Sequence, residues 1–164
     1  MKIINYELKY NDALVGMFDD FHNYMAFCDP SGRVKPFSNK EDVVKYVDKM
    51  INDSKNMNGF IFLAIIDNKP VGFVQGVIFD HQKDEMYKLV SNPGSQGWIG
   101  ELYVDSLFRG QGIGKLLFKK AKEYFEKNNC TALCLNVFDK NKDAMRLYYR
   151  LGMKTRKREM DLKL

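Results

Sequence analysis

The sequence has few cysteines, few histidines and no long apolar run. Its 3 cysteines and 2 histidines are scattered over 164 residues, without the spacing of a metal site or a disulfide framework. The longest apolar run, residues 60–66, is far shorter than the ~20 residues that span a bilayer. The first residues also lack the apolar stretch of a secretory signal. We therefore expect reduced thiols, no metal, no membrane contact and a cytoplasmic protein.

The basic residues do not form a stripe. The formal net charge is +5, but lysines are spread from Lys2 to Lys163, without the basic band interleaved with aromatic residues that is typical of a nucleic-acid groove. We therefore expect no nucleic-acid partner. The lysines at 115, 119, 120 and 122 have two readings, which are a solvated helix face and a patch that attracts a small polyanion.

The most informative stretch is residues 100–118, where a strand-like segment is followed by three alternating glycines and a helical pattern. A helix start carries unpaired N–H groups and partial positive charge, and glycine lets a ligand approach the backbone closely, so this arrangement suits a pyrophosphate. A Walker-type loop would need glycine in place of Arg109 and Ser or Thr in place of Leu116. A dinucleotide-binding fingerprint would need its last glycine at Lys115 or Leu117. Neither alternative fits.

Residues 109–114, Arg-Gly-Gln-Gly-Ile-Gly, resemble the Q/R-x-x-G-x-G/A signature of the GNAT superfamily of N-acetyltransferases. Residues 101–104 resemble the family's preceding strand, and residues 141–153 resemble its N-x-x-A-x-x-L-Y-x-x-L-G-F segment, with Met153 in place of the final Phe. The resemblance implies that acetyl-CoA is the co-substrate and that the loop amides hold its pyrophosphate. The residues that it assigns to acetyl-CoA binding are Leu102, Tyr103, Val104, Arg109, Gly110, Gln111, Gly112, Ile113, Gly114, Lys115 and Asn141.

Acetyl transfer to an amine requires a base, because an amine of pKa ~10.4 is almost fully protonated at neutral pH. Strand alternation places the Glu101 side chain with Ile99 and Tyr103, opposite Leu102 and Val104. In related enzymes a glutamate at or near this place acts as base, directly or through water. Glu101 is therefore the candidate base, and its alternative role is that of a carboxylate in a structural ion pair or at a solvated sheet edge.

The departing thiolate needs a proton, and the thioester carbonyl needs hydrogen-bond donors. Tyr148 matches the family's tyrosine and is the candidate acid, with a packed core aromatic as its alternative role. Tyr149 faces another side of the same helix. Backbone N–H groups near Val104 are expected to polarise the carbonyl.

The acceptor side is less specified. The first two helices and residues 80–96 are its expected walls, and their carboxylates and aromatic rings suit a small cationic amine, although a peptide or protein amine stays open. A homodimer also stays open, and a non-catalytic coenzyme-A-binding or regulatory module on the same fold is the alternative function. The wall residues are Asp19, Asp20, Asp29, Asp80, Asp84, Glu85, Phe21, Tyr24, Phe27 and Tyr87.

The periodicity predicts one domain over residues 1–164 with a mixed α/β fold, in which helices cover both faces of a largely antiparallel sheet. Strand, helix and strand over residues 98–137 imply one parallel pair, and the resemblance implies that this pair splays apart. The second helix is expected to begin at a Ser38 cap. Expected strands are residues 2–8, 59–66, 71–79, 98–104, 131–137 and 156–164, and expected helices are residues 11–27, 39–51, 113–128 and 141–152.

Overall fold

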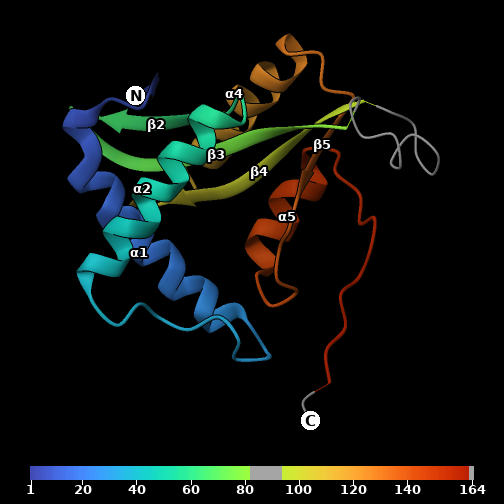
Figure 1. The fold of residues 1–164 in the computed structure, drawn as a ribbon, viewed down its shortest axis with the longest axis horizontal. Coiled ribbons are helices and arrows are strands. Elements are labelled where there is room, and N and C mark those ends of the chain that lie inside the picture. The colour runs from blue at the N-terminus through green and yellow to red at the C-terminus, as the bar shows by residue number, and fades with distance from the viewer. Residues whose placement is uncertain (82–93, 163–164) are drawn as a thin grey trace.

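The computed structural model describes residues 1–81 and 94–162 and shows a five-stranded sheet between helices (Figure 1). The strands lie in the order β1-β2-β3-β4-β5, and every neighbouring pair is antiparallel except β4 and β5. They are β1 (Lys2–Asn5), β2 (Phe60–Ile66), β3 (Lys69–Asp80), β4 (Ser95–Val104) and β5 (Ala132–Leu135). The α-helices are α1 (Asn11–Cys28), α2 (Lys40–Asn56), α4 (Ile113–Lys127) and α5 (Lys142–Arg150). The predicted mixed α/β fold is confirmed.

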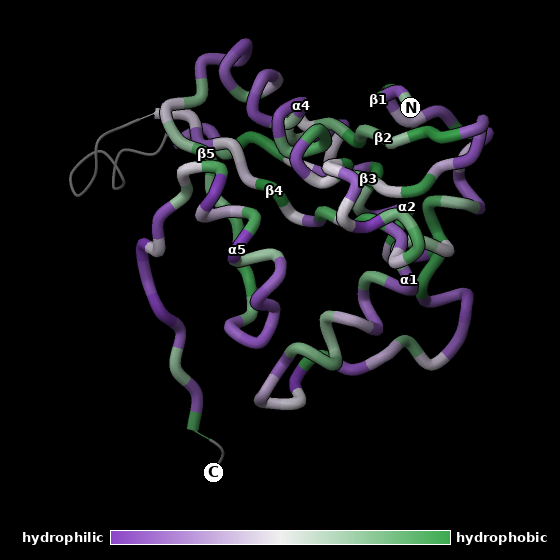
Figure 2. Tube along the Cα trace, turned by 180° about the vertical axis from the view of Figure 1, so that it is seen from behind, coloured by the Kyte–Doolittle hydropathy of each residue, from purple (hydrophilic) through white to green (hydrophobic). Residues whose placement is uncertain are grey.

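Each face of the sheet is covered by its own helices. Helices α1 and α2 pack on one face through a core that includes Phe18, Val47 and Phe73, and α4 packs on the other through a core that includes Leu117. Apolar residues run along β2 and β3, while the helices alternate apolar and polar sides (Figure 2). Both strands are buried on two sides, as expected for central strands. No helix in the described part of the chain is long and apolar enough to cross a membrane.

A bulge in β4 divides its side chains between the two faces. The register against β3 shifts so that Gly100 is an extra residue between Ile99 and Glu101. A Cβ at Gly100 would lie 2.3 Å from Oε1 of Gln75, so a larger residue there would have to displace the Gln75 side chain. Ile99 packs against α4, whereas Glu101 and Tyr103 face α1 and α2. The predicted grouping of Glu101 with Tyr103 is confirmed, and its grouping with Ile99 is wrong because the bulge breaks the alternation.

Strands β4 and β5 separate after a short parallel ladder. Residues 96–99 pair with residues 132–135, and residues 100–104 have no strand on that side within the described chain. The splay that the family resemblance implied is therefore present. Backbone polar groups along this edge of β4 are left available for a ligand.

Helix α2 begins one residue later than the sequence suggested. Asn39, not Ser38, is the N-cap, and its side chain accepts a hydrogen bond of 3.0 Å from the backbone N–H of Asp42. Both residue types can cap a helix, so the sequence alone did not decide between neighbours.

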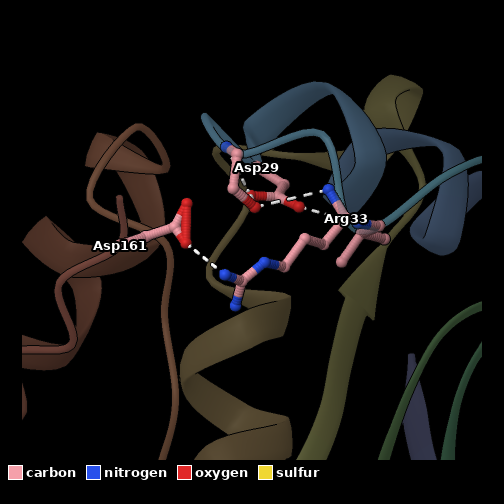
Figure 3. Close-up of polar contacts among 5 residues, drawn as sticks. Asp29, Arg33 and Asp161 are labelled. Atoms are coloured by element: carbon pink, nitrogen blue, oxygen red, sulfur yellow. Dashed lines mark hydrogen bonds and ion pairs between the residues drawn. The ribbon is translucent and has the colours of Figure 1, made fainter. Parts of the chain in front are cut away.

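The final strand expected over residues 156–164 does not form in the part that the structure describes, up to residue 162. Five of its seven described residues are charged, and its two apolar residues, Met160 and Leu162, are 93% and 80% exposed and so are not buried against the sheet. It runs instead toward the connection between α1 and α2, where Asp161 pairs with Arg33 at 2.6 Å (Figure 3). That connection turns on Asp29, which accepts backbone N–H bonds from Ser31 and Val34; these bonds, with that of Val34 first, lower the pKa of Asp29 to about 2.

Candidate active site

The glycine loop presents a row of backbone donors. The N–H groups of residues 110–115 have no backbone acceptor among the described residues, and the first helical bond of α4 runs from Leu116 to the carbonyl of Gly112 at 3.1 Å. Gly110 and Gly112 have φ of +78° and +81°, and no atom lies within 4 Å of a Cβ built on either. Glycine is therefore required there by backbone conformation and not by lack of room. The free donors and the positive end of α4 make this loop suited to a pyrophosphate.

The third glycine of the loop has a packing role. A Cβ on Gly114 would lie 3.3 Å from Cδ2 of Leu147 and 3.8 Å from side-chain atoms of Leu102 and Val104. Gly114 therefore lets α4, α5 and β4 meet closely. Leu102, Val104 and the fully buried Ile113 place their side chains in the core beneath α4, so a ligand would meet their backbone. The side chains of Gln111 and Lys115 are exposed.

Arg109 does not extend along the row of amides. Its Nε donates to the carbonyl of Val104 at 2.9 Å, and its guanidinium lies 5.5 Å from the ring centre of Tyr24 and 6.0 Å from that of Tyr103. Arg109 thus ties the end of β4 to α1, a contact that the sequence did not indicate because it depends on where α1 packs. Asn141 caps α5 as expected, accepting from the N–H of Ala144 at 3.3 Å.

Tyr148 lies on α5 against Phe118, with ring centres 6.1 Å apart. Burial raises the pKa of Tyr148 to about 12, so its hydroxyl keeps its proton at neutral pH. That hydroxyl forms no hydrogen bond with any described residue, although the ring is packed. Tyr149 differs on both points, since it is 50% exposed and its hydroxyl bonds Thr155 at 2.8 Å.

Glu101 lies in a cavity of about 220 Å³ between α2 and the sheet. Its carboxylate forms no hydrogen bond or ion pair with the described residues, so the structural ion pair considered for it is absent there. Burial, and then the negative charge of Asp53, raises the pKa of Glu101 to about 7. A carboxyl group that titrates near neutral pH can accept a proton from an ammonium ion and release it to solvent. The cavity is lined by Tyr46, Lys49, Met50, Asp53, Met57, Gln75, Val77, Phe79 and Glu101.

Three of the six acidic side chains predicted to wall the acceptor site lie outside the Glu101 cavity. Asp20 accepts from the Tyr103 hydroxyl at 3.3 Å, Asp29 fixes a turn, and Asp19 borders a separate cavity of about 300 Å³ between α1 and α2. Asp84, Glu85 and Tyr87 lie outside the described residues.

The walls of the Glu101 cavity come from α2 and β3. The sequence analysis named the second helix as a wall of the acceptor site, but it named neither β3 nor the α2 residues that line this cavity. Tyr46, Met50, Asp53 and Met57 follow one another at helical spacing, so a signal was present. The pattern did not stand out, because aromatic, thioether and carboxylate side chains also occur together on ordinary amphipathic helices. In residues 1–81 and 94–162, no group of three or more His, Cys, Asp or Glu side chains is placed to hold a metal.

Comparisons with known proteins agree with this arrangement. The chain is 37% identical over 101 residues to an uncharacterized N-acetyltransferase of Methanocaldococcus jannaschii, a match that covers 60% of this chain and 40% of that protein. It is 28% identical over 83 residues to the spermine/spermidine N(1)-acetyltransferase of Bacillus subtilis, covering 50% of this chain and 51% of the relative. Each match spans about half of the relative's length or less.

A solved Bacillus halodurans protein, crystallised as a tetramutant, has the same fold, with a TM-score of 0.83 at 20% identity over 100% of both chains. The sequence pattern of the acetyltransferase (GNAT) family matches residues 9–153, which include β4, the glycine loop and α5. With the splayed strands and the free amides of the loop in the places that this match covers, the chain belongs to the acetyltransferase (GNAT) family.

Proposed function

We propose that this protein is an N-acetyltransferase that moves the acetyl group of acetyl-CoA to a primary amine by direct attack within a ternary complex. The row of backbone N–H groups over residues 110–115 carries the proposal, because these donors have no backbone acceptor in the described chain and lie at the start of a helix. The pyrophosphate of acetyl-CoA binds there. Its pantetheine arm follows the unpaired edge of β4 over residues 100–104.

The acceptor amine enters the Glu101 cavity on the other face of the sheet. An incoming ammonium group loses one proton to the Glu101 carboxylate, directly or through a water molecule, and becomes a nucleophile. The raised pKa of Glu101, about 7, suits this role because the group is largely ionised at slightly alkaline pH and still holds a proton well enough to take one. Backbone N–H groups near Val104 polarise the thioester carbonyl.

As the nitrogen attacks the carbonyl carbon, the N–C bond forms and the C–S bond breaks. The nitrogen gives up two protons in all: one goes through Glu101 to solvent, and the other reaches sulfur through Tyr148. With its pKa at about 12, the Tyr148 hydroxyl is a weaker acid than an ordinary thiol of pKa ~8.5. Tyr148 therefore gives its proton to sulfur while it receives the nitrogen's proton, and the products are the acetylamide and the free thiol.

The acceptor in this proposal is a small cationic amine, and a peptide or protein amine is the second class considered. The carboxylates and aromatic rings around Glu101 support the first class. So does the relative from Bacillus subtilis, which is named for spermine and spermidine.

The direct test is release of free thiol from acetyl-CoA in the presence of a panel of primary amines and short peptides. We expect amine-dependent release by the wild-type protein, and a drop of roughly 10²- to 10⁴-fold in kcat/KM for Glu101→Gln, the usual range for a proton-transfer group. Glu126→Gln, on the exposed surface of α4, is the matched control and keeps full activity. Binding of coenzyme A without turnover of any amine would instead support a non-catalytic module.

A further inference from the structure

The Glu101 cavity contains two carboxylates with different surroundings. Glu101 lies at the sheet without a partner in the described chain, whereas Asp53 lies one wall away on α2 and pairs with Lys49. Fully ionised, these three side chains carry a net charge of −1. The cavity therefore attracts a cation, because its negative charge is not fully balanced by these side chains.

Asp53 can exchange its partner at little cost. The side chains of Lys49 and Asp53 are 69% and 43% exposed, and a solvated pair of this kind contributes little to stability. Asp53 and Glu101 line the same cavity, and the charge of Asp53 helps to raise the pKa of Glu101. A ligand ammonium can thus take the place of the Lys49 ammonium.

The rest of the lining suits a methylene chain. Tyr46 and Phe79 expose 44% and 37% of their surfaces, and Met50 and Met57 add flexible thioethers to the same lining. The side-chain Nε2 of Gln75 is already engaged, because it donates to Oγ of Ser54 at 2.9 Å. This hydrogen bond joins β3 to α2.

We propose that the acceptor is a short, unbranched α,ω-diamine, or the diamine end of a longer polyamine, and that Asp53 binds its second ammonium group while Glu101 deprotonates the first. Tyr46 and Phe79 cover the chain between the two nitrogens. This proposal rests on the proposed N-acetyltransferase function and names the substrate class of the same site. Asp53 is the specificity residue, because an amine with one charge leaves it paired with Lys49.

The test compares pentane-1,5-diamine with hexan-1-amine, which have equal numbers of non-hydrogen atoms and differ by one charge. Thiol release is measured at pH 8.5, where Glu101 is ionised in all variants. The wild-type protein should prefer the diamine by roughly 10- to 100-fold in kcat/KM, the range of a charge-assisted hydrogen bond. Asp53→Asn should remove this preference by raising KM for the diamine.

A second variant gives a result that misfolding cannot imitate. Lys49→Met removes the ammonium that competes for Asp53 and should lower KM for the diamine. The control, Glu126→Gln, breaks an i,i+4 pair with Lys122 outside the cavity and should change neither amine. Equal use of both amines by the wild type, or a preference that survives Asp53→Asn, overturns the diamine proposal alone. Absence of thiol release with every amine overturns the acetyltransferase proposal and this one with it.

Discussion

On the α4 side of the sheet the groups available to a ligand are backbone N–H groups, whereas on the α2 side they are carboxylates and aromatic rings. The donors of residues 110–115 exist because α4 begins there, and they depend on side chains only through the glycines that permit the turn. The charge of the cavity on the α2 side, by contrast, comes from the side chains of Glu101 and Asp53. The proposed co-substrate side is thus fixed by chain conformation, whereas the proposed acceptor side can change with single substitutions and with pH.

Substitution of Tyr148 is the strongest test of this contrast, because Tyr148 is the one side chain with a proposed chemical role on the α4 side of the sheet. If its hydroxyl carries the proton to sulfur, Tyr148→Phe should lower kcat by roughly 10²- to 10⁴-fold and leave the affinity for coenzyme A within about twofold, since phenylalanine preserves the contact with Phe118. Assays of thiol release give kcat, and calorimetry gives the affinity for coenzyme A. Tyr149→Phe is the control, because its hydroxyl bonds Thr155 on the surface. A wild-type kcat for Tyr148→Phe would remove this residue from the reaction.

Two glycines with the same backbone conformation separate ligand binding from backbone strain. Gly112 and Gly32 have φ of +81° and +68°, and neither has an atom within 4 Å of a built Cβ. Valine at either position should cost ~1–2 kcal/mol of stability, the penalty for a left-handed residue. Only Gly112→Val should also weaken coenzyme A binding, by tenfold or more, because only that turn orients the loop amides. Equal affinities for the two variants in calorimetry would show that the amides do not bind the coenzyme.

Ionisation of Glu101 should affect the thermal stability of the protein as well as its catalytic rate. The folded protein raises the pKa of Glu101 from 4.5 to about 7, so it binds this proton more tightly than the unfolded chain does. The stabilisation is complete below about pH 4.5 and is lost as the pH rises through about 7. Glu101→Gln cannot ionise, so its Tm should equal that of wild type near pH 4.5 and exceed it by a few degrees at pH 8.

Glu126→Gln is the matched control for the melting curves, since Glu126 lies on the exposed side of α4. Its difference from wild type should not vary with pH. A constant difference for Glu101→Gln as well would mean that Glu101 is not held in an unfavourable environment. In that case the two sides of the site would respond to pH alike, and the contrast between them would fail.

The elements that depend on local pattern were predictable from the sequence. The apolar runs of β2 and β3, the turn between them and the glycine loop before α4 are each specified by neighbouring residues. The family resemblance then supplied the splay of β4 from β5, which no periodicity shows.

What the sequence could not show depends on contacts between distant segments. The bulge at Gly100 lies opposite Gln75 and Gly76 of β3, and it moves Ile99 to the other face. Asp53 and Tyr46 were missed because their cavity appears only when α2 packs on the sheet. Arg109 was expected among the phosphate contacts, and its position over Tyr24 follows from the packing of α1. The expected last strand does not form among the described residues, where its apolar Met160 and Leu162 stay exposed.

The early end of the ladder between β4 and β5 has a consequence for handling the protein. An exposed strand edge can template association with another polypeptide, and residues 100–104 form such an edge next to an opening in the sheet. The pantetheine arm, with its two amide groups, would complete this edge much as a peptide strand would. Coenzyme A added during purification should therefore act as a small-molecule chaperone that keeps preparations monodisperse.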